Sequence, residues 1–163
     1  MTEDMDRRKF LSVGWKVGAV AIGCAGAWTS FDLLRPLPGT GLGGIVETVP
    51  VTEVPDDGTL YVQSAQTYLT RIGDEIVALW HKCPHLGCRV EWCEGSGEFE
   101  CPCHGSTFNR AGEVRSGPSP RGMDRFVVAE TDGVVAVDTG TVVQGPPAGS
   151  AESIDEPRRD GSC

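Results

Sequence analysis

Two short stretches of this chain hold six of the cysteine and histidine side chains that could bind a soft metal. One runs from Cys83 to Cys88 and the other from Cys101 to Phe108, with twelve residues between them. The candidate ligand pairs are Cys83 with His85 and Cys101 with His104, and the spare cysteines are Cys88 and Cys103. Two cysteines and two histidines can hold a [2Fe–2S] centre with histidine on one iron, or a tetrahedral zinc. The spare cysteines could form a disulfide in an oxidising compartment.

The spacing resembles that of the Rieske iron–sulfur proteins, more narrowly those of quinol–cytochrome c reductases. The resemblance extends to the Gly-Pro-Ser-Pro segment at residues 117–120, which is similar to the family's proline loop. It implies that Cys83 and Cys101 hold one iron and that His85 and His104 hold the other. Histidine ligation raises the potential to about −150 to +300 mV, which suits electrons from quinol. By the same resemblance, the two histidines are the proton-coupled electron acceptors from quinol.

The resemblance also assigns roles to residues around the cluster. It implies a disulfide between Cys88 and Cys103 that braces the two stretches. The Ser106 hydroxyl would bond a bridging sulfide, Leu86 would shield the cluster and dock in a quinol pocket, and Pro118 would lie in the covering loop. A free pair of thiols and an ordinary turn are the plainer interpretations of the cysteines and of the proline loop.

Phe108 departs from the family pattern, because many high-potential members have a tyrosine there that donates to a cysteine sulfur. A phenyl ring cannot donate, so we predict a lower potential that fits menaquinol better than ubiquinol. Plain core packing would account for Phe108 equally well. The twelve-residue spacing, with Val90 and Trp92 after the first stretch, looks most like the chloroplast-type and menaquinol-type branch.

The N-terminal region, residues 1–34, is predicted to anchor the chain in a membrane. Residues 6–11 resemble a twin-arginine export signal. The 22 residues from Phe10 to Phe31, with Lys16 the only charge between them, can cross about 30 Å of hydrocarbon. The basic start places the N-terminus in the cytoplasm and the rest on the extracytoplasmic side of the cell membrane. Cleavage near residues 25–27 and lipid attachment at Cys24 remain open as alternatives.

The rest of the chain divides into a linker, a head and a tail. Residues 35–44 are rich in proline and glycine, which predicts a linker that the family resemblance makes a hinge. Residues 45–143 read as a small antiparallel all-β domain with hairpin turns at residues 73–74 and 131–133. Residues 144–163 contain one large apolar side chain and are predicted to be disordered. The expected strands are residues 45–54, 60–63, 68–72, 75–80, 97–100, 125–130 and 134–137.

Composition narrows the classes of partner. The 163 residues have a formal net charge of −9, which argues against nucleic acid as a partner.

Cys93 and Cys163 belong to no motif, although they could pair with each other.

The whole pattern favours the Rieske subunit of a membrane quinol–cytochrome c oxidoreductase, inactive alone. It would pass electrons from quinol, at a cytochrome b-type subunit, to a cytochrome c-type subunit within a dimeric complex. Two alternatives stay open: the small subunit of an arsenite-oxidase-like molybdenum enzyme, and an exported structural zinc module.

Overall fold

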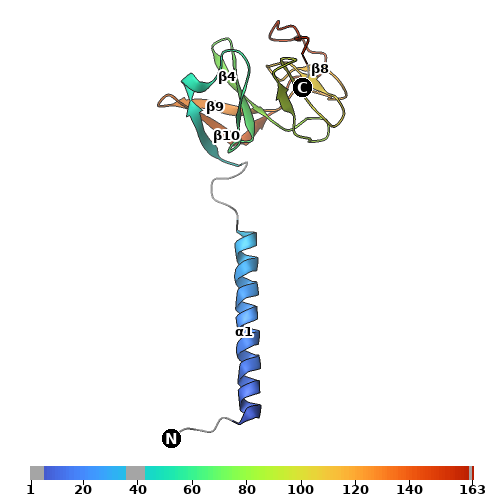
Figure 1. The fold of residues 1–163 in the computed structure, drawn as a ribbon. Helices are drawn as coiled ribbons and strands as arrows, with labels where there is room; N and C mark the ends of the chain where they lie inside the picture. Colours follow the sequence, from blue (N-terminus) through green and yellow to red (C-terminus); the bar gives the residue numbers. More distant parts are fainter. Residues whose placement is uncertain (1–5, 36–42, 162) are drawn as a thin grey trace. The chain divides into compact units, whose positions relative to one another are not determined.

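The computed structural model describes residues 6–35, 43–161 and 163, which form a helix and a β-strand head (Figure 1). Helix α1 spans Arg7–Leu34, a length of about 42 Å at 1.5 Å per residue. Its side chains are exposed almost throughout, and an 18-residue window within it has a mean hydropathy of 1.5. The helix is therefore long and apolar enough to cross a membrane. Most of the predicted linker, residues 36–42, lies outside the described residues.

The head contains two antiparallel sheets. The larger has the strand order β1-β10-β9-β4-β3-β2 and the smaller has the order β5-β6-β7-β8. The strands of the larger sheet are β1 (Ile45–Pro50), β2 (Leu60–Val62), β3 (Thr67–Ile72), β4 (Glu75–Trp80), β9 (Arg125–Thr131) and β10 (Val134–Val143). Those of the smaller sheet are β5 (Glu91–Cys93), β6 (Glu98–Glu100), β7 (Thr107–Phe108) and β8 (Val114–Ser116). A 3₁₀ turn, Val51–Glu53, follows β1.

The sequence-based prediction of an antiparallel β domain is confirmed. The turn at residues 73–74 joins β3 to β4, and the turn at residues 131–133 joins β9 to β10. Strand Glu75–Trp80 has its predicted bounds, whereas the strand beginning at Val134 continues to Val143. Strands β5, β7 and β8 were not predicted, whereas the equally short β2 and β6 were. Two or three residues are too few for an alternating pattern to decide whether a segment is a strand.

Two hydrophobic cores share strand β4. Ala78 packs in the core of the larger sheet, and the next residue, Leu79, packs in the core beneath the two cysteine–histidine stretches. Successive side chains of a strand point to opposite faces, so one strand supports both halves of the head. Cys83 and Cys101 belong to the second core, with exposed fractions of 3% and 4%.

The predicted disorder of residues 144–163 is wrong for the part of this tail that the structure describes. We call residues 145–161 and 163 the strap; in Figure 1 it is the dark red segment beside the part of the head that carries β8. Ser153 donates its amide to Glu113 at 3.0 Å, and Cys163 forms a disulfide with Cys93. The prediction considered only apolar burial, whereas the strap is held by ion pairs, backbone hydrogen bonds and a covalent bond.

Candidate metal centre

The two cysteine–histidine stretches fold into loops with the same backbone frame. In the first loop, the Cys83 amide donates to the Cys88 carbonyl at 2.7 Å, and the Gly87 amide donates to the Cys83 carbonyl at 2.8 Å. In the second loop, Cys101 and Gly105 make the equivalent bonds, with Ser106 in the place of Cys88, at 2.9 and 3.1 Å. Each frame therefore fixes the backbone of one buried cysteine.

Glycine is required at the fourth position after each of these cysteines. Gly87 has a φ of +83° and Gly105 has a φ of +73°, a region that side chains with a Cβ rarely adopt. The loops connect β4 to β5 and β6 to β7. The first loop ends at β5 and the second begins at the end of β6, and these two strands pair with Glu91 opposite Glu100, so the loops lie at the same end of the smaller sheet.

All four predicted ligand side chains gather where the loops meet. The rings of His85 and His104 have their centroids 4.9 Å apart and are perpendicular. The thiols of Cys83 and Cys101 are close enough to hydrogen-bond and form no disulfide. The cysteines are buried, His85 is partly buried and His104 is exposed.

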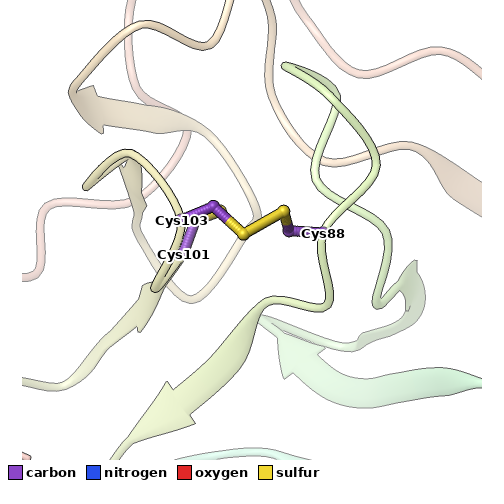
Figure 2. A group of neighbouring side chains, drawn as sticks. All are labelled: Cys88, Cys101 and Cys103. Carbon is purple, nitrogen blue, oxygen red and sulfur yellow. A yellow bond between two sulfur atoms is a disulfide. The ribbon is translucent and has the colours of Figure 1, made fainter.

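The spare cysteines lie at the same junction. Cys88 and Cys103 form a disulfide that links the loops, with their Cα atoms 6.6 Å apart. Figure 2 shows Cys88 reaching from one loop to Cys103 and Cys101 on the other, and the three sulfur atoms lie within 4.8 Å of one another. The pairing that the resemblance implied is present in the structure.

The surroundings of the free thiols suit metal-bound thiolates. Burial raises the pKa of the Cys83 thiol, and the neighbouring Cys101 thiol raises this pKa further. The backbone amides of His85 and Leu86 point at the same sulfur and act in the opposite direction. The Cys83 thiol is thus costly to ionise without a cation, has amide donors already in place and lies beside a second buried thiol, Cys101, which fits a metal that binds both sulfurs.

The spacing of the four donors fits two iron atoms better than one zinc. A single tetrahedral zinc would bring all four donor atoms within about 4 Å of one another. Among the described residues, no histidine nitrogen joins a group of three such donors within 4.8 Å. The donors are thus divided into a thiol pair and an imidazole pair, as a two-iron cluster with mixed ligands requires.

The loop at residues 117–120 packs directly against the second cysteine–histidine loop. The Ser119 amide donates to Ser106 Oγ at 3.1 Å. Ser106 is 1% exposed, and because its oxygen accepts that bond, its hydroxyl proton is left to donate elsewhere. A Cβ on Gly117 would lie 2.5 Å from the Ser106 Cα, so the two backbones are in close contact. Pro118 is exposed in the same loop.

The remaining predicted site residues have contrasting environments. Leu86 is 71% exposed at the tip of the first loop. Phe108 is fully buried on β7, opposite Phe99 on β6, so it packs in the core beneath the loops. His81, the third histidine of the chain, is bound through Nδ1 to the Tyr61 hydroxyl at 3.1 Å.

Sequence reasoning did not assign Cys93 and Cys163, which form a second disulfide. Cys93 ends β5 and Cys163 lies 70 positions further along the chain. The only signal in the sequence was that these two cysteines, together with Cys24, remain once the ligand and bridging residues of the two loops are set aside. In the structure the strap runs back to the hairpin between β5 and β6, and this brings Cys163 next to Cys93.

Comparison with known proteins identifies relatives of the head and of most of the chain. The family model described as "Rieske [2Fe-2S] domain" matches residues 45–137. The cytochrome b6-f complex iron-sulfur subunit 2 of the Cyanophora paradoxa cyanelle is 36% identical, covering 85% of this chain and 65% of that protein. The cytochrome b6-f complex iron-sulfur subunit 2 of Synechocystis is 33% identical, covering 79% of this chain and 81% of that protein.

A solved structure is also similar. The cyanobacterial plasma membrane Rieske protein PetC3 from Synechocystis is 26% identical, with a TM-score of 0.48 over 56% of this chain and 97% of that chain. The chain spans about two thirds of the length of the first curated relatives that it matches, 65% and 66%.

Proposed function

Because the chain belongs to the Rieske [2Fe–2S] domain family, we propose that it is the electron-transfer subunit of a membrane quinol–cytochrome c oxidoreductase. The observation that carries this proposal is the junction of the two loops, where a buried pair of free thiols adjoins a pair of facing imidazoles. The similarity of the chain to subunits named for cytochrome b6-f complexes supports the same assignment. The chain alone would transfer electrons but complete no quinol reaction.

The ligands follow from the donor pairs. Cys83 and Cys101 would hold one iron as thiolates, and His85 and His104 would hold the other through ring nitrogens. When bound, the cluster accepts one electron and passes it on. The core and the backbone frames position the thiolates away from water, whereas the imidazoles face outward.

The exposed side of the site suits a quinol. His104 is exposed and His85 is partly exposed, so each can present its second ring nitrogen to a substrate hydroxyl and take its proton. Leu86, 71% exposed beside them, offers an apolar contact for the quinone ring or for the rim of a cytochrome b-type subunit. We therefore place quinol at the histidine side of the loops.

We infer that menaquinol is the donor. Phe108 has no hydroxyl to donate to a cluster sulfur, and each lost donor leaves more negative charge uncompensated in the reduced state, which lowers the potential. Menaquinol is a stronger reductant than ubiquinol and suits a lower-potential acceptor. The cytochrome c-type acceptor and a dimeric complex are part of the same proposal.

Membrane attachment completes the assignment. Helix α1 is apolar enough to span a bilayer, and the basic residues at its start favour a cytoplasmic N-terminus. We propose that α1 is retained as a single-pass anchor and that the head works on the extracytoplasmic side. Residues 35–44 would then form the hinge between anchor and head.

The experiment that tests the ligand assignment uses all three histidines. The full-length protein is purified from membranes in detergent, and the reduced cluster is measured by EPR and visible absorbance. His85→Gln and His104→Gln are expected to lose the cluster signal. His81→Gln is the matched control, because His81 hydrogen-bonds to Tyr61 instead, and it is expected to keep the signal. A retained signal in either of the first two variants contradicts the assignment.

The quinol and the acceptor are tested on the native complex. The complex is purified through a tag on this chain, and its haem subunits are identified by mass spectrometry. Cytochrome c reduction is then measured with menaquinol and ubiquinol analogues. We expect co-purifying cytochromes and faster turnover with the menaquinol analogue. Molybdenum in place of haem would refute the proposal.

A further inference from the structure

The strap, residues 145–161 and 163, packs against the smaller sheet and lies next to the second cysteine–histidine loop. A cavity of about 380 Å³ is lined by Cys101 and Ser106 of the second cysteine–histidine loop, by Trp92 of β5, and by Arg158 and Cys163 of the strap. The strap therefore lines the same cavity as a predicted iron ligand.

Ion pairs join the strap to the strand that leads into that ligand. Arg158 lies 3.3 Å from Glu98 and 3.6 Å from Glu100, both on β6. Glu98 is only 3% exposed, and its other cationic neighbour, Arg115, is at 4.0 Å. A buried carboxylate needs a partner, so removing Arg158 from Glu98 would disturb the strand immediately before Cys101.

Backbone contacts fix the strap's last turn to the hairpin between β5 and β6. The Arg159 amide donates to the Ser96 carbonyl at 2.9 Å, and the Arg159 guanidinium pairs with Asp57 at 3.0 Å. A Cβ on Gly97 would lie 3.1 Å from the Arg159 side chain, so the surfaces are in close contact. The Cys93–Cys163 disulfide then closes this arrangement covalently.

The two sulfurs of that disulfide differ in their access to a reductant. Cys163 is exposed, whereas Cys93 is 2% exposed. A thiolate of an external dithiol can reach Cys163 Sγ and form a mixed disulfide with it, so that Cys93 leaves as a thiolate. The Ser96 amide lies 3.5 Å from Cys93 Sγ and stabilises that leaving group.

The exchange balances with a dithiol as the reductant. The second thiol of the dithiol attacks the mixed disulfide and frees Cys163. The dithiol ends as a disulfide, having supplied two electrons and two protons, and the protein ends with two thiols. No other oxidant or reductant is needed.

From these contacts we propose that the strap shields the metal centre and is released when the Cys93–Cys163 disulfide is reduced. With Cys93–Cys163 oxidised, the strap covers the back of the second loop and completes the pairing of Glu98. When a dithiol reduces that bond, the strap detaches, water enters the cavity beside Cys101, and the cluster is lost faster. The part that concerns cluster loss rests on the proposed function, whereas the release of the strap does not.

Strap release is tested on the wild-type, full-length protein in detergent. The protein is titrated with dithiothreitol, its thiols are trapped by alkylation and identified by mass spectrometry, and tryptic cleavage after Arg158 and Arg159 is timed in each sample. We expect cleavage to rise about tenfold as Cys93 and Cys163 become alkylated, the change that 1.4 kcal/mol of lost docking produces. Unchanged cleavage after both thiols are labelled, or failure of dithiothreitol to label them, overturns the proposal.

The effect on the metal centre is tested without a reductant, so that Cys88–Cys103 stays intact. Cys163→Ser is compared with Cys24→Ser, which removes an exposed cysteine that forms no disulfide. The rate at which cluster absorbance is lost in the presence of a chelator should rise several-fold in the first variant and stay at the wild-type value in the second. Equal rates overturn the proposal that the strap shields the cluster. If Cys163→Ser does not fold, the chelator assay is made on wild type titrated with dithiol to the point at which mass spectrometry finds Cys93 and Cys163 alkylated and Cys88–Cys103 still intact.

The two proposals fail in different ways. If the wild type binds no [2Fe–2S] cluster, the proposed function is wrong, but the cleavage experiment still tests the strap on the cluster-free protein. If the wild type binds a cluster and Cys163→Ser loses it no faster than the control does, the proposed function stands and the proposed shielding of the cluster by the strap is wrong.

Discussion

Gly117→Ala tests how closely the proline loop must approach the second cysteine–histidine loop. At Gly117 a Cβ would lie 2.5 Å from the Ser106 Cα and 2.8 Å from the Gly105 carbonyl oxygen. Both are backbone atoms, so no flexible side chain can move aside. Gly117 also has a φ of +91°, which strains any residue with a Cβ.

A matched glycine separates the strain from the contact. Gly133, in the β9–β10 turn, has a φ of +76°, and a Cβ added there would meet no other atom within 4 Å. Gly133→Ala should therefore cost only the backbone strain, about 1 kcal/mol. Gly117→Ala should cost that strain plus about 1–3 kcal/mol of overpacking. The expected difference in unfolding free energy between the two variants is thus about 1–3 kcal/mol.

The displaced loop should also change the redox potential. Pushing residue 117 away from Ser106 breaks the 3.1 Å bond from the Ser119 amide that orients the Ser106 hydroxyl. If that hydroxyl stabilises the reduced cluster by about 1 kcal/mol more than the oxidised one, its loss lowers the midpoint by about 40 mV.

The assays are urea unfolding, followed by circular dichroism, and spectroelectrochemical titration of the full-length protein in detergent. The reasoning requires Gly117→Ala to be less stable than Gly133→Ala and to have the lower midpoint potential. If the two variants have equal stability and equal potential, the close approach of residue 117 to Ser106 has no energetic importance and the account is refuted.

Two further predictions concern buried groups near the site. Phe108→Tyr should raise the midpoint by about 40 mV if the new hydroxyl donates to a cluster sulfur; an unchanged or lower value contradicts this, and Phe99→Tyr, equally buried on the neighbouring strand, is the control. For Glu113, burial raises the pKa, but hydrogen bonds from Asn109 and Ser153 outweigh it and leave the pKa below its ordinary value. A depressed pKa contributes stability that is present above the unfolded-state pKa and is lost as the pH falls through the folded one. Urea unfolding from about pH 7 to about pH 3 should therefore show a smaller acid loss in Glu113→Gln than in wild type, and equal losses would contradict the assignment.

The ligand set could be predicted from sequence because it depends on local spacing. A cysteine and a histidine two or three positions apart, as in Cys83 with His85, can serve one site whatever the rest of the fold does. The meeting of the two loops, and the disulfide between Cys88 and Cys103, could be predicted only through a resemblance to known proteins. The equivalent frames around Gly87 and Gly105 were not predicted, since they depend on backbone hydrogen bonds that leave only a glycine in the sequence.

The strap could not be predicted, for a different reason. Its composition resembles that of disordered segments, because its contacts are polar and distant in sequence. Arg110 binds Glu156, 46 positions away, and Arg159 binds Asp57, 102 positions away. Charge patterns along the chain do not indicate which opposite charges will meet. Only the unassigned Cys93 and Cys163 hinted at a long-range link.

The size of the smaller sheet explains why the metal centre needs these links. Its four strands have two or three residues each, too few to be stable as a sheet on their own. Leu79 from the neighbouring sheet supplies part of its core, and disulfides hold its two ends. In the chain-entropy model, loops of 15 and 70 residues give stabilisations of about 3 and about 4 kcal/mol. Each is a large fraction of a small domain's stability of about 5–15 kcal/mol. The loops that hold the thiol and imidazole pairs therefore owe their fixed geometry to two disulfides more than to the size of the sheet beneath them. Cys88–Cys103 joins the two loops, and Cys93–Cys163 joins β5 to the strap.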